Sequence, residues 1–126
     1  MKINFDATKP IYEQIIDQIK KMLIRQEMSP GEKLPSQRDL ARLIEVNPNT
    51  IQRAYREMEL LELVETRRGK GTFIKEDEKM MSEIRREMAR DAANKFIEEM
   101  LSLGFSQAEI VTWIENELVD LKKHTN

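Results

Sequence analysis

The sequence contains no cysteine, a single histidine (His124), and only four glycines and four prolines among its 126 residues. Without cysteine there are no disulfide bonds and no thiolate metal sites, and one histidine does not make a histidine metal site or catalytic pair. The stretch Gly69-Lys70-Gly71 lacks the strand-to-helix context of a nucleotide-binding loop. We therefore expect no enzyme activity, no catalytic residue, no metal and no cofactor.

Long apolar runs are also absent, as is a basic segment followed by an apolar one at the start of the chain. These absences predict a protein that does not enter a membrane and that works in the cytoplasm. The 40% hydrophobic and 35% charged residues are typical of soluble proteins, and 126 residues suffice for one modest core with an appendage.

An apolar stripe with helical spacing predicts a first helix that begins at Thr8-Lys9-Pro10 and is ended by Pro30-Gly31. We interpret this helix as a support element whose stripe lies in the core. The stripe consists of Tyr12, Ile15, Ile16, Ile19, Met22 and Leu23.

A second helix is predicted to begin at Ser36, because Asp39 three residues later completes a capping-box pattern. Arg38 and Arg42 lie one turn apart on this helix, where they would be able to bind DNA phosphates, although either could equally be a solvated charge. The stripe that we expect to face the core is Leu40, Leu43 and Ile44.

A third helix is predicted to begin at Pro48, because Asn47 can cap it and proline suits the first helical position. The three residues 45–47 before it have the length of a helix-turn-helix connection. Its apolar side consists of Ile51, Ala54, Tyr55 and Met58, whereas its polar side consists of Asn49, Arg53 and Arg56, with Gln52 in between.

The polar side of this third helix is suited to reading bases, since arginine and asparagine side chains can bond guanine and adenine in the major groove. Arg53 and Asn49 are the best candidates for that role. Taken alone, however, this pattern is equally typical of an ordinary surface helix that binds nothing.

Two strand-like runs, 63–66 and 72–75, flank residues 67–71 and predict a β-hairpin with a basic tip. Arg67, Arg68 and Lys70 crowd this tip, where like charges repel each other, but they would be favourable beside a phosphate backbone or in a minor groove. Together with the two helices before it, the hairpin predicts a winged helix-turn-helix that binds double-stranded DNA.

The tail after Lys75 predicts two amphipathic helices, one from Glu76 to Leu103 that Gly104 stops, and one that begins with a capping box at Ser106. Their apolar stripes are too long to cover each other, which predicts a two-helix dimerisation hairpin that pairs with a second copy. The alternative is that the hairpin folds back on its own winged domain. The expected interface residues are Met81, Ile84, Met88, Phe96, Met100 and Trp113.

The distribution of charge also changes after residue 75, where the tail begins. Residues 1–75 contain 14 basic and 11 acidic side chains, whereas residues 76–126 contain 7 basic and 12 acidic ones. We therefore expect a mainly helical protein with a DNA-binding domain at 1–75 and a helical dimerisation domain at 76–126. Since a net charge of +3 is modest for a DNA-binding domain, we expect affinity to depend on dimerisation.

Residues 8–75 resemble the GntR family of bacterial transcription regulators, and the short tail resembles that of the small YtrA-type subgroup. The resemblance is carried by Leu34-Pro35-Ser36, Asn47-Pro48-Asn49-Thr50, Ala54-Tyr55-Arg56 and the wing Arg68-Gly69-Lys70-Gly71-Thr72-Phe73. It implies DNA contacts at Ser36, Arg38, Asn49, Thr50, Arg53, Arg68, Gly69 and Lys70.

This resemblance implies a transcription regulator, which we expect to be a repressor. The polar side of the third helix and the uncovered stripes of the tail predict that it acts as a homodimer on a near-palindromic operator, and the sequence leaves open an unknown small-molecule effector. Some family members have arginine where this chain has Pro48, so base preference does not transfer from them. The alternative is a winged helix that binds proteins or RNA. A row of cations along one edge argues against a protein partner, and the major groove of double-stranded RNA is too narrow for a helix to read.

Overall fold

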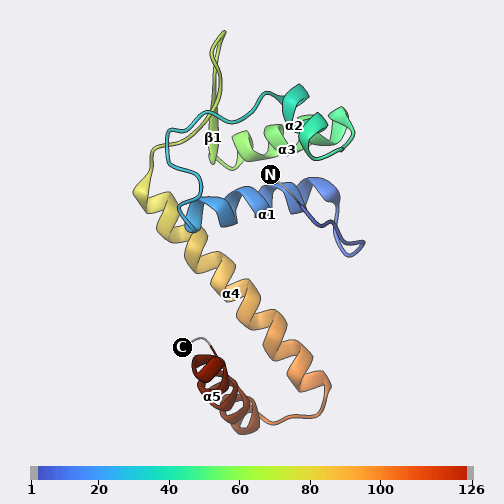
Figure 1. The fold of residues 1–126 in the computed structure, drawn as a ribbon, viewed down its shortest axis with the longest axis vertical. Coiled ribbons are helices and arrows are strands. Elements are labelled where there is room, and N and C mark those ends of the chain that lie inside the picture. The colour runs from blue at the N-terminus through green and yellow to red at the C-terminus, as the bar shows by residue number, and fades with distance from the viewer. Residues whose placement is uncertain (1–2, 125–126) are drawn as a thin grey trace. The chain divides into compact units, whose positions relative to one another are not determined.

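A computed structural model describes residues 3–124, which form five helices and a two-stranded antiparallel sheet (Figure 1). The fold divides into two compact units, Met1–Arg85 and Arg86–Asn126. The predicted class, a mainly helical chain with a winged helix-turn-helix followed by two helices, is confirmed. The first unit contains α1 (Ile11–Ile24), α2 (Gln37–Leu43), α3 (Pro48–Leu60), β1 (Val64–Arg67), β2 (Gly71–Ile74) and the first turns of α4 (Glu78–Ser102).

The core of the first unit lies where α1 and α2 pack on α3. Most of the predicted α1 stripe is buried, whereas Tyr12 and Met22 are half-buried. The side chains that build this core from α1 and α3 are Ile15, Ile16, Ile19, Leu23, Ile51, Ala54, Tyr55 and Met58.

The predicted starts of α2 and α3 are both confirmed. The Ser36 hydroxyl accepts a hydrogen bond from the Asp39 N–H at 3.1 Å, and the Asn47 side chain accepts one from the Asn49 N–H at 2.8 Å. Each bond satisfies an N–H that has no partner within its own helix.

The ends of α1, α2 and α3 share one geometry. Just after each helix, a residue other than glycine has the left-handed conformation: Gln26 at φ 62°, Glu45 at φ 54° and Glu62 at φ 61°. The next N–H then bonds back to the last turn, as from Leu63 to the Met58 carbonyl at 2.9 Å. This geometry stops α1 at Ile24, before the predicted stop at residues 30–31.

The core-facing stripe of α2 differs in part from the prediction. Leu40 is buried together with Ala41, whereas Leu43 is 60% exposed. At 100° per residue, Leu40, Ala41 and Ile44 share one side of the helix, and Leu43 projects about 100° away from it. The sequence pattern therefore placed Leu43 in the core incorrectly.

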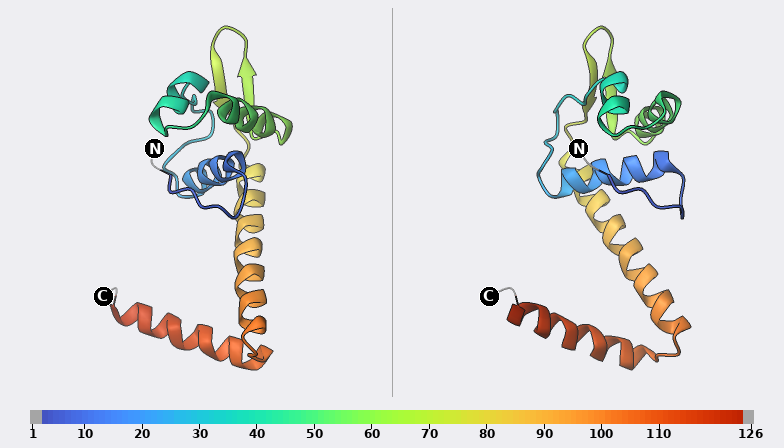
Figure 2. Two further views of the ribbon diagram at one scale, coloured as in Figure 1. Left: turned by 90° about the vertical axis from the view of Figure 1, so that its right-hand side faces the viewer. Right: turned by 45° about the vertical axis from the view of Figure 1, so that its right-hand side comes forward.

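The hairpin is paired one residue further toward its tip than predicted, with Arg67 opposite Gly71. Residues 31–34 run along the other edge of β2, where the Leu34 N–H bonds to the Thr72 carbonyl at 2.8 Å and Lys33 forms a bridge with Phe73. The hairpin projects past α2 and α3, which gives the wing of the fold (Figure 2).

The two helices of the tail begin and end close to the predicted positions. Asp77 caps α4 through the Met80 N–H at 3.1 Å, and Gly104, at φ 89°, ends it. At α5 (Gln107–His124), Ser106 and Glu109 exchange hydrogen bonds of 3.0 and 3.2 Å, which confirms the second capping box. These bonds hold the pKa of the exposed Glu109 carboxyl below its ordinary value. Among residues 3–124, no helix combines the length and apolar character needed to cross a bilayer.

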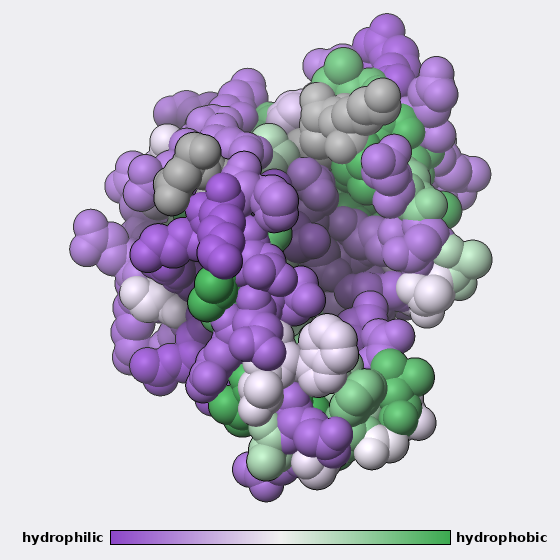
Figure 3. Space-filling model, turned by 60° about the horizontal axis from the view of Figure 1, so that its bottom comes forward, coloured by the Kyte–Doolittle hydropathy of each residue, from purple (hydrophilic) through white to green (hydrophobic). Residues whose placement is uncertain are grey.

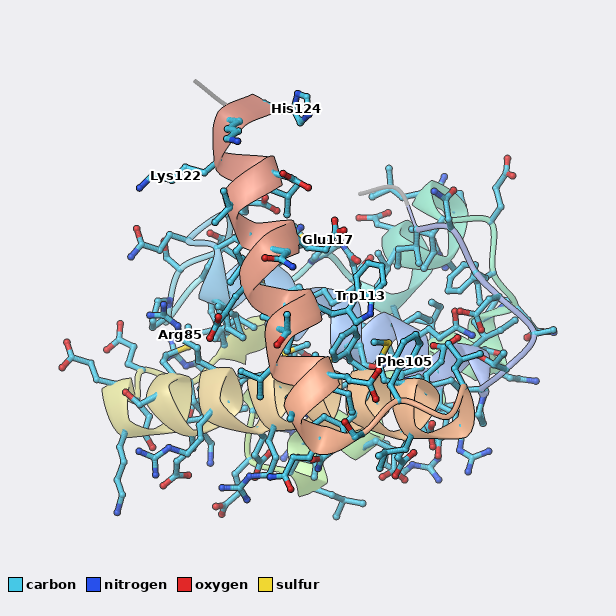
Figure 4. The ribbon with its side chains drawn as sticks, turned by 90° about the horizontal axis from the view of Figure 1, so that it is seen from below. Arg85, Phe105, Trp113, Glu117, Lys122 and His124 are labelled. Atoms are coloured by element: carbon cyan, nitrogen blue, oxygen red, sulfur yellow. The ribbon has the colours of Figure 1, made fainter. Side chains whose placement is uncertain are left out.

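Within the second unit, α4 and α5 diverge from their connection instead of packing along each other (Figures 1 and 2). Ile110 is buried near this connection, and the rings of Phe105 and Trp113 meet edge to face with centroids 6.0 Å apart (Figure 4). The expected hairpin is thus an open pair of helices over the described residues, and it leaves apolar side chains uncovered.

Candidate nucleic-acid interface

A groove of about 600 Å³ opens between α2 and α3 on the surface of the first unit. We call it the α2–α3 groove. It brings together Arg38 and Arg42 from α2 with Asn49 and Gln52 from α3. Four residues predicted to contact DNA therefore share one concave surface. Four further residues that the sequence pattern did not single out as DNA contacts complete the lining: Gln37, Ala41, Val46 and Pro48.

The cations of the α2–α3 groove are not equivalent. Arg42 forms an ion pair with Asp39 at 3.1 Å, and because both side chains are exposed the pair is weak. Within residues 3–124, Arg38 has neither an ion pair nor a side-chain hydrogen bond. Arg38 is therefore the cation in this groove with its donors free for an anion.

Tyr55 holds the N-terminus of α2 against α3. Its hydroxyl donates to the Pro35 carbonyl at 2.6 Å, and the residue is only 4% exposed. Burial, followed by the negative charge of Asp39, raises the pKa of Tyr55 to about 12, so the hydroxyl remains a donor even at a pH where a solvent-exposed tyrosine ionises. Because Pro35 directly precedes the Ser36 cap, this bond ties the start of α2 to α3.

Arg53 lies outside the α2–α3 groove. Its guanidinium is 4.0 Å from the centroid of the Tyr12 ring on α1, a cation–π contact within the unit. Thr50 is half-buried and Arg56 is exposed on the same helix. The geometry thus places Gln52, rather than Arg53, beside Asn49, and the prediction that Arg53 reads bases remains a prediction.

Arg67 is held on the side of the wing instead of standing free at its tip. Its guanidinium bonds to the Glu65 carboxylate at 2.8 and 3.1 Å and lies 4.2 Å from the centroid of the Phe73 ring. Cross-strand pairing places Glu65 opposite Phe73, so all three side chains share one side of the sheet. The predicted cluster of three cations at the tip is therefore reduced to two.

The tip itself is a tight turn that presents Arg68 and Lys70. The Lys70 N–H bonds to the Arg67 carbonyl at 2.9 Å, and Gly69 has a φ of 77°, as the third residue of a type II turn requires. Both cations are exposed, and neither has an ion pair in the described part of the chain.

The predicted dimer-interface residues differ in how accessible they are. Ile84 is only 8% exposed in the single chain, so it offers little area to a partner. Met81, Met88 and Met100 are half-buried. Phe96 and Trp113 belong to a larger exposed apolar set on the second unit. Figure 3 shows green, apolar surface mixed with white and purple at the lower edge of the view. The set includes Phe96, Ile97, Leu101, Leu103, Val111, Trp113, Ile114, Leu118 and Val119, each between 39% and 66% exposed.

Comparison with known proteins gives concordant results. Residues 11–74 match the bacterial regulatory proteins of the gntR family. The HTH-type transcriptional regulator YhcF of Bacillus subtilis is 47% identical over 115 residues, which cover 91% of this chain and 95% of that protein. The HTH-type transcriptional repressor YtrA of the same organism is 37% identical over 123 residues, which cover 97% of this chain and 95% of that protein.

A solved structure has a similar fold over most of its length. A GntR family transcriptional regulator from Listeria monocytogenes aligns with a TM-score of 0.80 at 39% identity, covering 89% of this chain and 98% of that one.

Proposed function

Because the chain belongs to the GntR family of DNA-binding transcription regulators, we propose that it acts as a homodimer on a near-palindromic DNA operator. The observation that carries this proposal is the α2–α3 groove, where cations and amides from two helices converge. Cations position a protein on the phosphate backbone, whereas amides and guanidinium groups read base edges. The groove holds both kinds of side chain.

The four predicted contact residues that line the groove then have distinct roles. Asn49 and Gln52 lie on the first turns of α3, the part of a recognition helix that enters the major groove, and their amides can bond adenine in bidentate fashion. Arg38 and Arg42 bind phosphates where α2 crosses the backbone. The wing binds an adjacent groove or backbone through Arg68 and Lys70. The proposed contact surface also includes Ser36, Thr50, Arg53, Arg56, Arg67 and Gly69.

The homodimer is supported by the exposed apolar set on the second unit. Patches of this kind usually mark an interaction surface in a soluble protein. A second copy related by two-fold symmetry would cover the same residues on both chains, and it would place two winged domains on the two halves of a palindrome.

Repression is the regulatory outcome that we propose, because the relative YtrA is named a transcriptional repressor. Operators of bacterial genes lie in the cytoplasm, where we expect this chain to act.

Selection from a random pool of DNA duplexes, followed by footprinting of the enriched sequence, tests this function. We expect two half-sites separated by about one helical turn or a multiple of it. An RNA duplex of equal length should bind far more weakly, because its major groove excludes the helix. Failure to enrich any sequence, protection of one asymmetric half-site at saturating protein, or equal binding of RNA would contradict the proposal.

A further inference from the structure

Lys33 lies beside the wing, although it comes from the segment that precedes α2. Its backbone forms a bridge with Phe73 of β2, and the flanking Ile74 N–H bonds to the Glu32 carbonyl at 2.9 Å. Paired residues in antiparallel strands project to the same side of a sheet. The Lys33 side chain therefore emerges on the side of the wing that carries Phe73 and Arg67.

Gly71 provides the space into which the Lys33 side chain extends. A β-carbon built on Gly71 would lie 2.7 Å from Cε of Lys33 and 3.5 Å from its Nζ. The φ of Gly71, 118°, is also one that other residues rarely adopt. The lysine stem thus lies against bare backbone, and its ammonium reaches the residue that directly follows Lys70.

Within residues 3–124, the ammonium of Lys33 forms no ion pair. Glu65, on the same side of the hairpin, is bonded to Arg67, and Glu32 accepts from the Ser29 N–H at 3.3 Å. A cation placed next to the basic tip of the wing repels the charges already there. That placement becomes favourable when an anion is bound between them.

We propose that Lys33 binds a backbone phosphate of DNA, so that the wing holds the duplex through two separate segments of the chain. This inference rests on the proposed DNA-binding function. An ammonium is a point charge without the planar fork of arginine, so it suits phosphate more than base edges. Lys33 therefore adds affinity for every DNA sequence and contributes nothing to preference between sequences.

The test measures how the affinity of the full chain for the selected operator and for a random duplex depends on salt. Lys33→Ala should weaken both duplexes by the same factor and lower the slope of log affinity against log salt by about 0.9 for each phosphate that Lys33 neutralises. Lys33→Gln, which keeps much of the stem without the charge, should behave in the same way. Lys33→Arg should retain most of the wild-type slope.

Lys21→Ala is the matched control, because it removes one exposed cation from α1 and should leave the slope unchanged. Circular dichroism of each variant confirms that the fold is intact. An unchanged slope for Lys33→Ala, or a weakening with alanine but not with glutamine, would overturn the inference while the chain still binds its operator. If the wild-type chain binds neither duplex, the proposed function itself fails.

Discussion

The guanidinium of Arg53 on α3 lies 4.0 Å from the centroid of the Tyr12 ring at the start of α1. A cation that the sequence assigns to the DNA-reading side of α3 therefore makes a contact inside its own unit. The relationship changes which residue of α3 we expect to read bases, and it gives Tyr12 a structural role beyond that of a core residue.

The first prediction concerns this contact. Tyr12→Ala removes the ring beneath Arg53, whereas Tyr12→Phe keeps the ring and removes only a long 3.4 Å hydrogen bond to Glu13. The alanine variant should reduce the free energy of unfolding and the phenylalanine variant should change it little. In a double-mutant cycle with Arg53→Ala, urea unfolding should give a coupling of about 0.5–1 kcal/mol. Strictly additive effects would show that the two side chains do not interact.

The second prediction distinguishes the residue of α3 that recognises bases from the residue that has a structural role. Gln52→Ala should cost about 1–3 kcal/mol per half-site and relax the preference at particular base pairs, because Gln52 lies in the α2–α3 groove. Arg53→Ala should weaken binding without changing that preference. Competition among operators with single base changes measures both effects. A change of preference in Arg53→Ala alone would return the reading role to Arg53, as the sequence pattern suggests.

The third prediction concerns Tyr55 and pH. Tyr55→Phe leaves the half-buried Pro35 carbonyl without its donor, so it should reduce the free energy of unfolding by about 1 kcal/mol at neutral pH. The folded chain holds the pKa of Tyr55 at about 12, above the ordinary value of 10.0, so it keeps a proton that the unfolded chain loses. The stability from Tyr55 is therefore fully present below pH 10 and is lost as pH rises toward 12.

Denaturant unfolding at a series of pH values, followed by circular dichroism, checks this prediction. The wild-type chain should lose more stability than Tyr55→Phe over that range. Parallel pH profiles for the two proteins would mean that burial does not hold the proton on Tyr55.

The fourth prediction concerns the tail. A chain ended after Arg85 keeps the whole first unit, including the buried Ile84, so it should fold. It should be monomeric, and its affinity for the operator should fall by about 10²- to 10⁴-fold, because two tethered domains gain through effective concentration. Sedimentation and operator titration measure both properties. A shortened chain that stays dimeric, or that binds as tightly as the full chain, would disprove the role assigned to the tail.

Polar replacement of Phe96 and Trp113 in the full chain should have the same effect as shortening it. Lys95→Gln is a suitable control, because Lys95 is an exposed neighbour of Phe96 on α4. This control variant should remain dimeric.

Local features of the fold could be predicted from the sequence because their causes are local. Ser36, Asn47 and Ser106 each cap a helix by accepting from an N–H two or three residues away. The apolar side of α3 likewise follows from helical periodicity alone. Neighbouring residues determine such features, so a short stretch of sequence is enough to predict them.

Features that join distant segments could not be predicted in this way. The contacts of Arg53 with Tyr12 and of Lys33 with Gly71 depend on how whole elements cross, which periodicity does not describe. The exposure of Leu43 depends on the direction from which α3 approaches α2. The angle between α4 and α5 depends on the connection at residues 103–106, where the sequence predicted the end of one helix and the start of the next but not the direction between them.

The left-handed residues that end α1, α2 and α3 lower the stability of the winged domain, because each stores backbone strain. Gln26, Glu45 and Glu62 each adopt a conformation that costs a side-chain-bearing residue about 1–2 kcal/mol, whereas α4 ends at a glycine that avoids this strain. Glycine at any of the three positions would relieve it without altering the groove-lining side chains or the wing. The melting temperature of this domain can therefore be raised by changes at its helix ends, which lie apart from the residues proposed to contact DNA.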